Sequence, residues 1–307
     1  MKFLFLILVL VNTSFANDQL RKFCKSTVEK AESVRAVEGK DQWLFPFVEI
    51  KHLAKESQYL EKALLAIIDY KKALEKESIE LLVVPVPPKG LIYKEHLVDV
   101  HDQWNPYLKF HEALKKQNVK SLDLVPVFYD LKKEKQVFCK RDSHFSPAMA
   151  KVIADSIFSK SGFKNEDWEL KLEKLKVDFE GDLVRQSEKK FGNESFEIEY
   201  LTMDKKFINP NAGSPVILVG DSNSLIFSSG GDMHTRGAGV FDFLNLSFGQ
   251  PVDLIGVKGS GIDQARVDFF RRSMDLNYLK KKKLVIWLFA AYELTESRGW
   301  KNIPVRR

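Results

Sequence analysis

The chain has little cysteine, no internal repeat and no long apolar run beyond its first residues. Its 307 residues include two cysteines, too few for a disulfide-built scaffold. After residue 16, no apolar stretch approaches the about 20 residues that a membrane-spanning helix needs. The net charge of +6 is a small excess among 48 basic and 42 acidic side chains. Since no pattern of basic and aromatic residues accompanies this excess, it does not indicate a nucleic-acid partner.

The N-terminus carries the longest apolar stretch. Lys2 precedes an apolar segment over residues 3–11, and the short polar segment that follows ends at Ala16. This pattern is typical of a secretory signal peptide over residues 1–16, and a retained N-terminal anchor is the alternative. We therefore expect an exported, periplasmic protein in which residues 17–307 form a single domain with a large core.

Both cysteines, Cys24 and Cys139, lie in the predicted mature chain. An oxidising compartment would permit a disulfide between them. Two buried thiols explain the same pair equally well, and the sequence leaves both interpretations open.

Short apolar runs rich in β-branched residues predict the buried strands of an α/β fold. They cover residues 79–86, 215–219 and 284–289. Helices are expected between and around these runs, because an α/β fold alternates the two elements. The predicted helices cover residues 56–77, 104–117, 147–160 and 262–279.

In other segments the apolar residues follow neither the helical nor the strand period clearly. Residues 119–131 predict a strand and a turn, and residues 91–103 predict a loop whose histidines, His96 and His101, are given no role. Residues 162–211 are dense in charge and predict short strands and loops that form an insertion or lid. Residues 227–239 are rich in glycine, which predicts a mobile segment.

A serine follows one of the predicted strands directly. The run 215–219 stops at Gly220-Asp221-Ser222, which places Ser222 at the carboxyl end of a buried strand. In open α/β sheets ligands bind at this edge, so Ser222 is a candidate nucleophile. The alternative is an ordinary tight turn, since Gly, Asp and Ser all favour turns.

Asp142 and His144 precede a predicted helix. Ser146 is a suitable N-cap and Pro147 a suitable first helical residue, so the helix should begin there. In an extended turn, residues two apart can point to the same side, which would let the Asp142 carboxylate orient the His144 ring. One alternative is a metal site, although a lone Asp-x-His lacks further ligands. The other is a helix cap with an incidental histidine.

Together the two segments supply the groups that activate a serine. A serine hydroxyl is a weak nucleophile, so it needs a base, and the base needs a group that holds its tautomer. Ser222, His144 and Asp142 would fill these roles, and the N–H of Ser222 or of its neighbour would stabilise the oxyanion. Further candidates for oxyanion or substrate contacts are Asn223, Gly261, Arg266 and Trp287.

In these segments the chain resembles the alginate O-acetyltransferase family of the AlgX and AlgJ type, which is similar to SGNH hydrolases. Residues 37–45 resemble the family's glycine turn and Trp-Leu-Phe segment, and residues 82–89 its Val-Val-Pro-Val-Pro-Pro-Lys strand. Residues 141–150 and 219–224 resemble its two catalytic blocks. Residues 284–294 match more weakly.

The chain departs from the family pattern beside the reacting groups. Ser143 and Phe145 stand where the family commonly has Thr and Trp, and Asn223 where it often has Phe. Tyr292 stands where an Arg is common. These departures leave the three reacting groups intact and put the fit of the substrate in question.

The resemblance implies a three-layer α/β/α fold of the SGNH-hydrolase type with a central, mostly parallel sheet, in which Asp-x-His comes before the serine. It also implies that an acetyl group passes to Ser222 and then to a hydroxyl of an exported polysaccharide, alginate or another exopolysaccharide. A membrane-bound O-acyltransferase would supply the acetyl group, and no metal or organic cofactor would be needed. The alternatives are a carbohydrate esterase with the same triad and a non-catalytic polysaccharide-binding or assembly protein.

Overall fold

A five-stranded parallel sheet forms the centre of the molecule. The computed structural model describes residues 18–31, 34–55, 60–187, 189–259, 261–297 and 299–306. The sheet contains β3 (Glu80–Val86), β4 (Lys120–Ser121), β7 (Val216–Gly220), β8 (Asp253–Gly256) and β9 (Leu284–Ala290). Its order is β4-β3-β9-β7-β8, and each neighbouring pair is parallel.

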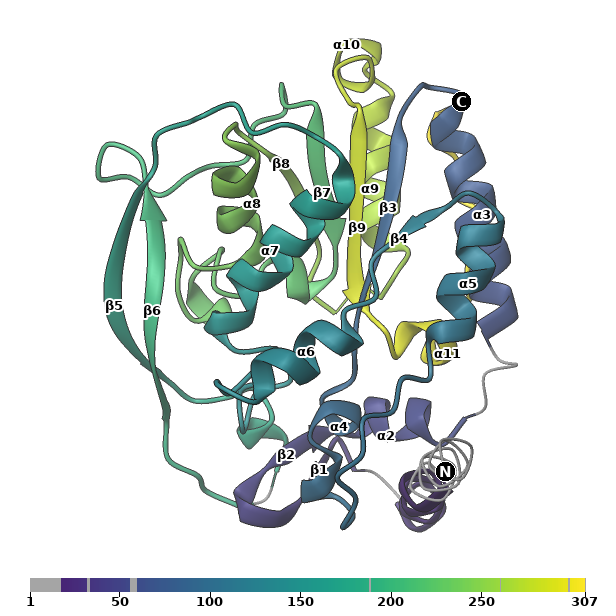
Figure 1. The fold of residues 1–307 in the computed structure, drawn as a ribbon, viewed down its shortest axis with the longest axis vertical. Helices are drawn as coiled ribbons and strands as arrows, with labels where there is room; N and C mark the ends of the chain where they lie inside the picture. Colours follow the sequence, from purple (N-terminus) through teal and green to yellow (C-terminus); the bar gives the residue numbers. More distant parts are fainter. Residues whose placement is uncertain are drawn as a thin grey trace, which may run out of the picture.

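Helices cover both faces of this sheet, with α9 on one side and α7 and α8 on the other (Figure 1). The longer helices are α3 (Glu61–Glu75), α5 (Leu108–Lys116), α7 (Pro147–Ser161), α8 (Val240–Phe248) and α9 (Gln264–Ser273). The shorter ones are α2 (Phe47–Leu53), α4 (Lys89–Ile92), α6 (Val125–Lys132), α10 (Leu276–Leu279) and α11 (Glu293–Glu296). Strands β7 and β9 are buried along their whole length, as their continuous apolar sequences require. The predicted α/β fold with a mostly parallel sheet is confirmed.

The carboxyl ends of the three central strands meet at one edge of the sheet. Gly220, the last residue of β7, is level with Leu288 of β9, and Val86, the last residue of β3, is level with Ala290. The segments that leave these strands therefore gather around a common space, as in other open α/β sheets. Ser222 lies in this space, two residues after the end of β7, as the first residue of a 3₁₀ turn.

Two predicted elements differ in detail from the structure. Residues 119–131, predicted as a strand and turn, form the two-residue β4 followed by α6. The helix starts here because the Asp123 carboxylate accepts the N–H of Val125 at 3.1 Å. The helix predicted over residues 262–279 is divided into α9 and α10 by a turn in which the side chain of Asp275 caps the second helix.

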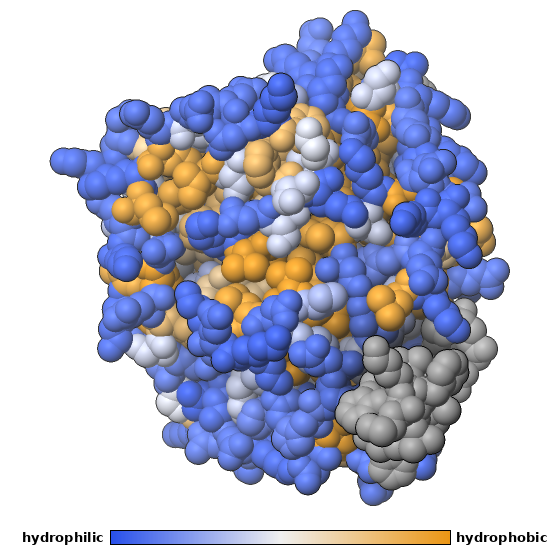
Figure 2. Space-filling model, in the orientation of Figure 1, coloured by the Kyte–Doolittle hydropathy of each residue, from blue (hydrophilic) through white to orange (hydrophobic). Residues whose placement is uncertain are grey.

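The predicted insertion over residues 162–211 is built around an antiparallel ribbon. Its strands, β5 (Lys171–Phe179) and β6 (Glu194–Thr202), contain 9 residues each and are longer than predicted. The ribbon stands at the side of the molecule, beside α7 and α8 (Figure 1). Figure 2 shows apolar atoms gathered near this junction, where Pro147, Val152 and Ile198 line a hollow.

A second small sheet lies beside α2, at the bottom of the view in Figure 1. It pairs β1 (Ala36–Glu38) with β2 (Leu44–Pro46) in antiparallel register, and α2 follows β2 directly. This segment includes the glycine turn and the Trp-Leu-Phe sequence of residues 37–45.

The two cysteines are free thiols buried in the core. The Cys139 thiol faces the carbonyl oxygen of Phe145 at 3.6 Å, within its own turn, and Cys24 lies on the N-terminal helix near Arg21. Burial raises the pKa of Cys24 to about 12 and that of Cys139 well above its ordinary value. Of the two interpretations that the sequence left open, the structure supports two buried thiols over a disulfide.

Within the described ranges, no helix combines the length and the apolar character that crossing a membrane would take. The predicted signal peptide, residues 1–16, lies outside these ranges.

A buried lysine, Lys89, links strand β2 to the segment that carries Asp142. Lys89 is fully buried, and its ammonium group donates hydrogen bonds to the carbonyl oxygens of Leu44 at 2.5 Å, Lys140 at 2.9 Å and Asp142 at 3.0 Å. The rings of Trp43 and Phe45 lie 5.2 and 5.4 Å from the same nitrogen. Burial lowers the pKa of Lys89 to about 8, so the ammonium form still prevails at neutral pH. The Pro-Pro-Lys segment between β3 and α4 thus holds the Asp142 turn in place.

Replacing Lys89 with Met should lower the free energy of unfolding by about 3 kcal/mol or more, because buried carbonyl groups would lose their charged donor. The measurement is urea unfolding followed by circular dichroism. Lys133, an exposed lysine paired with Asp130 at 2.8 Å, is the matched control, and its Met variant should stay within about 0.5 kcal/mol of wild type. Equal stability of the two variants would contradict this role of Lys89.

Denatured and unreduced protein should show two reactive thiols, because both cysteines are free. A thiol-reactive chromophore in guanidinium chloride gives the count, and the same protein after reduction provides the reference value. Thiols that become reactive only after reduction would mean that a disulfide had formed.

Candidate active site

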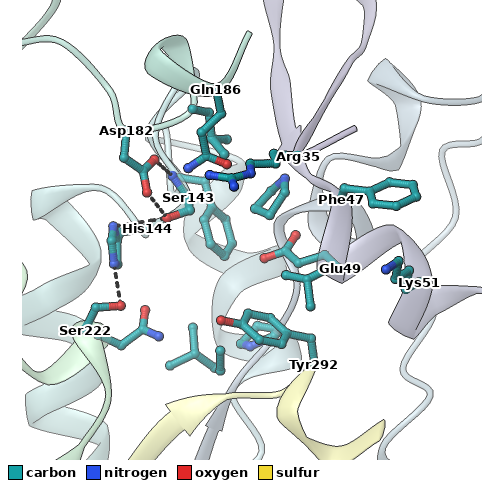
Figure 3. Close-up of a pocket in the computed structure, with 18 of the residues that line it drawn as sticks. Arg35, Phe47, Glu49, Lys51, Ser143, His144, Asp182, Gln186, Ser222 and Tyr292 are labelled. Carbon is teal, nitrogen blue, oxygen red and sulfur yellow. Dashed lines mark hydrogen bonds between the residues drawn. The ribbon is translucent and has the colours of Figure 1, made fainter. Parts of the chain in front are cut away.

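A cleft of about 370 Å³ opens at the carboxyl edge of the sheet. Ser222, Ser143 and His144 form one wall in Figure 3, while Glu49, Arg35 and Tyr292 face them from the other side. The segments after β3, β7 and β9 all contribute, as their common edge requires. The remaining lining residues include Val34, Pro46, Phe47, Val48, Lys51, Val86, Pro87, Phe138, Asp182, Leu183, Gln186, Asn223 and Ala290.

The position of Ser222 is set by its neighbour Asp221. One carboxylate oxygen of Asp221 accepts the main-chain and side-chain N–H groups of Asn223, both at 2.9 Å, and the other accepts the N–H of Ala290 at 2.8 Å. Asp221 thereby caps the single 3₁₀ turn over Ser222–Ser224 and joins it to the end of β9. The turn presents the Ser222 hydroxyl to the cleft on a rigid support.

His144 stands between Ser222 and Asp142. Its Nε2 lies 2.8 Å from the Ser222 Oγ, and its Nδ1 lies 2.7 Å from the Asp142 Oδ1. The same carboxylate oxygen accepts the main-chain N–H of His144 at 3.0 Å, which explains why the two residues point to one side of the turn. The predicted helix begins at Pro147, although Ser146 donates its hydroxyl to the carbonyl of Gln136 instead of capping it. The structure thus brings together the three groups that the sequence singled out.

Charges around the pair favour an ionised Asp142 and a basic His144. Burial opposes the ionisation of Asp142, but His144 and His234 hold the pKa of this carboxyl well below its usual range. Burial also favours the neutral ring of His144, yet the Asp142 carboxylate outweighs this effect and raises the pKa of His144 to about 9. Asp182 and Asp221 add to the rise. The His144 ring, which faces the Ser222 hydroxyl, is therefore a strong proton acceptor.

The segment over residues 162–211 supplies contacts to Asp142 that sequence analysis did not find. The N–H of Asp182 donates to the second Asp142 oxygen at 2.9 Å, and the Asp182 carboxylate accepts the N–H and the hydroxyl of Ser143 at 2.7 and 2.6 Å. Glu194, the first residue of β6, accepts the N–H groups of Lys140 and Arg141, both at 2.6 Å. Residues far apart in sequence therefore fix the Asp-x-His turn.

The loop after β5 approaches this turn very closely. A Cβ atom on Gly181 would collide with the carbonyl group of Arg141 and with the N–H of Asp142. Only glycine allows this approach, which brings Asp182 beside Asp142. The glycine is visible in the sequence, but its partner is not.

A second histidine also contacts Asp142. The Nε2 of His234 lies 2.9 Å from the Asp142 Oδ2, so the carboxylate carries a ring on each of its oxygens. His234 belongs to the glycine-rich segment 227–239, for which the sequence predicted mobility and no function.

Of the further predicted contact residues, one lines the cleft and the others do not. Asn223 lines it, with one side-chain N–H already donated to Asp221. Arg266 is buried, pairs with Asp263 at 2.7 Å and lies 4.6 Å from the ring of Trp287, which is buried in β9. Both side chains pack into the core, so their predicted contact with substrate is wrong.

Gly261 likewise stands apart from the residues that line the cleft. It adopts a φ of +59°, and a Cβ atom there would lie 3.0 Å from the Glu293 carboxylate. Its predicted role as an oxyanion or substrate contact is therefore not supported by its position.

Asp142, His144 and Asp182 also form a cluster whose ligand-type atoms lie within 4.8 Å of one another. Each ring nitrogen of His144 already faces a partner, Asp142 on one side and Ser222 on the other. Both oxygens of Asp182 accept hydrogen bonds from Ser143. This arrangement of donors and acceptors favours activation of a serine over coordination of an ion.

Replacing Asp142 with Asn should lower the rate of Ser222 acylation by an activated ester by about 10⁴-fold, since the ring loses its orienting carboxylate. The pH of half-maximal rate should fall, because the charge that raises the pKa of His144 is gone. The measurement is acylation rate against pH. Asp130, whose side chain is 74% exposed, provides the matched Asn control. An unchanged midpoint in the Asp142 variant would contradict the assignment of His144 as the base.

Comparison with known proteins agrees with this geometry. Residues 36–291 match the family described as SGNH hydrolase-like domain, acetyltransferase AlgX. The probable alginate O-acetylase AlgJ of Pseudomonas putida is 32% identical over 124 residues, which are 39% of this chain and 32% of that protein. The corresponding protein of Pseudomonas syringae pv. tomato is 32% identical over 124 residues, 39% of this chain and 31% of its own. These matches span about a third of the length of the curated relatives.

Solved structures show the same fold. The O-acetyltransferase domain of Pseudomonas putida AlgJ has a TM-score of 0.67 and 21% identity, covering 85% of this chain and 92% of that one. AlgX of Pseudomonas aeruginosa has a TM-score of 0.65 and 19% identity, covering 89% of this chain and 66% of that one. The family match extends over most of the chain, from β1 to the end of β9, and the chain therefore belongs to the AlgX family of SGNH-hydrolase-like proteins.

Proposed function

We propose that the protein is a periplasmic O-acetyltransferase that acetylates hydroxyl groups of an exported polysaccharide. The observation that carries this proposal is the hydrogen-bonded series from Ser222 through His144 to Asp142 at the cleft. Membership of the AlgX family supports the reaction type. The names of the matched AlgJ proteins support an alginate-like acceptor. We further propose that residues 17–307 act as one domain, with 162–211 as its insertion.

In the first half-reaction, His144 Nε2 takes the hydroxyl proton of Ser222 while the Oγ attacks the carbonyl carbon of an acetyl donor. The bond from the acetyl carbon to the donor breaks, and the departing group receives the proton from His144. Acetyl-Ser222 remains. Asp142 stabilises the imidazolium that forms between the two proton transfers.

In the second half-reaction, a sugar hydroxyl gives its proton to His144 and attacks the acetyl carbon. The bond to Ser222 Oγ breaks, the oxygen recovers the proton, and the sugar leaves as an acetate ester. The N–H of Ser222 is the proposed first donor to the oxyanion, with the remaining N–H of the Asn223 side chain as the second. This chemistry needs no metal or organic cofactor.

The acetyl donor would be delivered by a membrane-bound O-acyltransferase, as the family resemblance implies. The sugar chain would enter from the open side of the cleft. Arg35 and Lys51 lie among the lining residues there and offer positive charge to an acidic polymer.

The direct test is intact-mass analysis after incubation with an activated acetyl ester. Wild-type protein should gain one acetyl group on Ser222, and Ser222→Ala should gain none there while retaining its melting temperature. Ser143, which lines the same cleft, provides the comparison: its Ala variant keeps the nucleophile and should still be acetylated. Acetylation that persists in Ser222→Ala would rule out this nucleophile.

The acceptor is tested separately, because water and a sugar hydroxyl can both resolve the same acyl-enzyme. Pre-formed acetyl-enzyme should transfer its acetyl group to bare polyuronate oligosaccharides, as detected by mass spectrometry of the sugars. Release of acetate with no sugar ester would indicate a carbohydrate esterase instead. Sugar binding with no acetyl-Ser222 at all would indicate a non-catalytic binding protein.

A further inference from the structure

His234 makes the contact with Asp142 that the proposed reaction does not yet use. An ionised carboxylate only accepts hydrogen bonds, so the His234 Nε2 that lies 2.9 Å from Asp142 Oδ2 must carry the hydrogen. The other oxygen, Oδ1, faces the Nδ1 of His144 at 2.7 Å. One carboxylate thus connects two histidine rings, and only one of them reaches Ser222.

The backbone at His234 is held in an uncommon conformation. Its φ and ψ are 70° and −68°, and the N–H of Thr235 donates to the carbonyl of Met233 at 3.0 Å. This is the rarer, strained γ-turn geometry, which non-glycine residues adopt only where the surroundings compensate the strain. The main chain on either side is fixed by hydrogen bonds between Phe227 and Met233 and between Gly230 and Thr235. The strained turn directs the ring at Asp142.

Packing holds the ring in the same orientation. The His234 ring stacks on Phe179, the last residue of β5, with centroids 3.7 Å apart and planes 14° from parallel. Phe227 lies on a further side at 5.8 Å. The side chain is 7% exposed. A buried ring that lies between apolar neighbours and donates its hydrogen bond to Asp142 is placed for that contact.

We propose that His234 is a positioning residue that holds Asp142 in place and takes up part of its negative charge, and so sets the basicity of His144. The proposal rests on the function proposed above. Each donor on a carboxylate withdraws charge from its other oxygen. Removal of the His234 N–H would therefore leave more charge facing His144 and would make that ring more basic.

Other charged or titratable groups lie near the same pair, and a test must leave them unchanged. From elements packed around Asp142 and His144 they are Lys89, Cys139, Asp182, Glu194 and Asp221. On the His234 segment, Asp232 is exposed and pairs with Lys258 at 2.6 Å. A change confined to residue 234 leaves all of these groups in place.

The main variant is His234→Phe, which keeps a ring against Phe179 and removes the N–H. Because a bulky Phe is poorly suited to the positive φ of this turn, a second pair compares His234→Gln with His234→Met. Gln and Met have similar length, but only Gln offers an N–H close to the position of Nε2. His101→Phe, at an exposed histidine, is the control.

Loss of the donor in Phe and Met should lower kcat/KM for acetyl transfer about ten- to a hundredfold, the scale of one hydrogen bond to a charged group. The pH of half-maximal kcat/KM should move upward, opposite to its movement in Asp142→Asn. The Gln variant and the His101 control should keep the wild-type midpoint. A rate loss with an unmoved midpoint in both Phe and Met would overturn the proposal and leave His234 a structural residue.

The effect of His234 on the basicity of His144 can also be measured without catalysis. Nuclear magnetic resonance of the His144 ring against pH should show a higher midpoint in His234→Met than in His234→Gln. Equal midpoints would overturn the proposal. If wild-type protein transfers no acetyl group, the proposed function fails, while this titration still decides whether His234 tunes His144.

Discussion

The buried ammonium group of Lys89 is the interaction on which the site depends most. Lys89 begins α4, shortly after β3, and its ammonium group joins this point to the main chain of β2 and to the turn that carries Asp142 through three carbonyl oxygens. A buried charge is costly unless each of its donors is used, and here one donor is used on β2 and two on the turn that carries Asp142. This explains in physical terms why the Trp-Leu-Phe, Pro-Pro-Lys and Asp-x-His segments occur together: each supplies part of one cluster around a single cation.

The Asp142 carboxylate is the second centre of organisation. It accepts hydrogen bonds from the ring and the main chain of His144, from the N–H of Asp182 and from the ring of His234. Such a carboxylate stays ionised and cannot turn, so it fixes both the tautomer and the direction of the His144 ring. The Ser222 hydroxyl then meets a ring nitrogen at 2.8 Å without any further adjustment. Burial makes the charged form of each group less stable because it removes water, and the hydrogen bonds offset this loss.

The segment over residues 162–211 contributes to the site through contacts that its sequence does not predict. Its ribbon brings Gly181, Asp182 and Glu194 against the Asp-x-His turn, and the last residue of β5 stacks on His234. An irregular, charged stretch without period is hard to place from sequence, since its partners lie elsewhere in the chain. The same reason explains the errors at Arg266 and Trp287, which pack on one another in the core although each residue type is common at binding sites.

The sequence by itself determined the α/β alternation, the buried strands, the helix that begins at Pro147 and the choice of Ser222, His144 and Asp142 as the candidate triad. These features depend on short-range patterns: apolar period, turn chemistry and the rule that ligands gather where parallel strands end. Only the tertiary structure decided that the two cysteines stay apart as free thiols and that Lys89, Asp182 and His234 converge on Asp142. These contacts join residues from about 40 to more than 90 positions apart, and such pairs are set by packing of the whole fold rather than by any local preference.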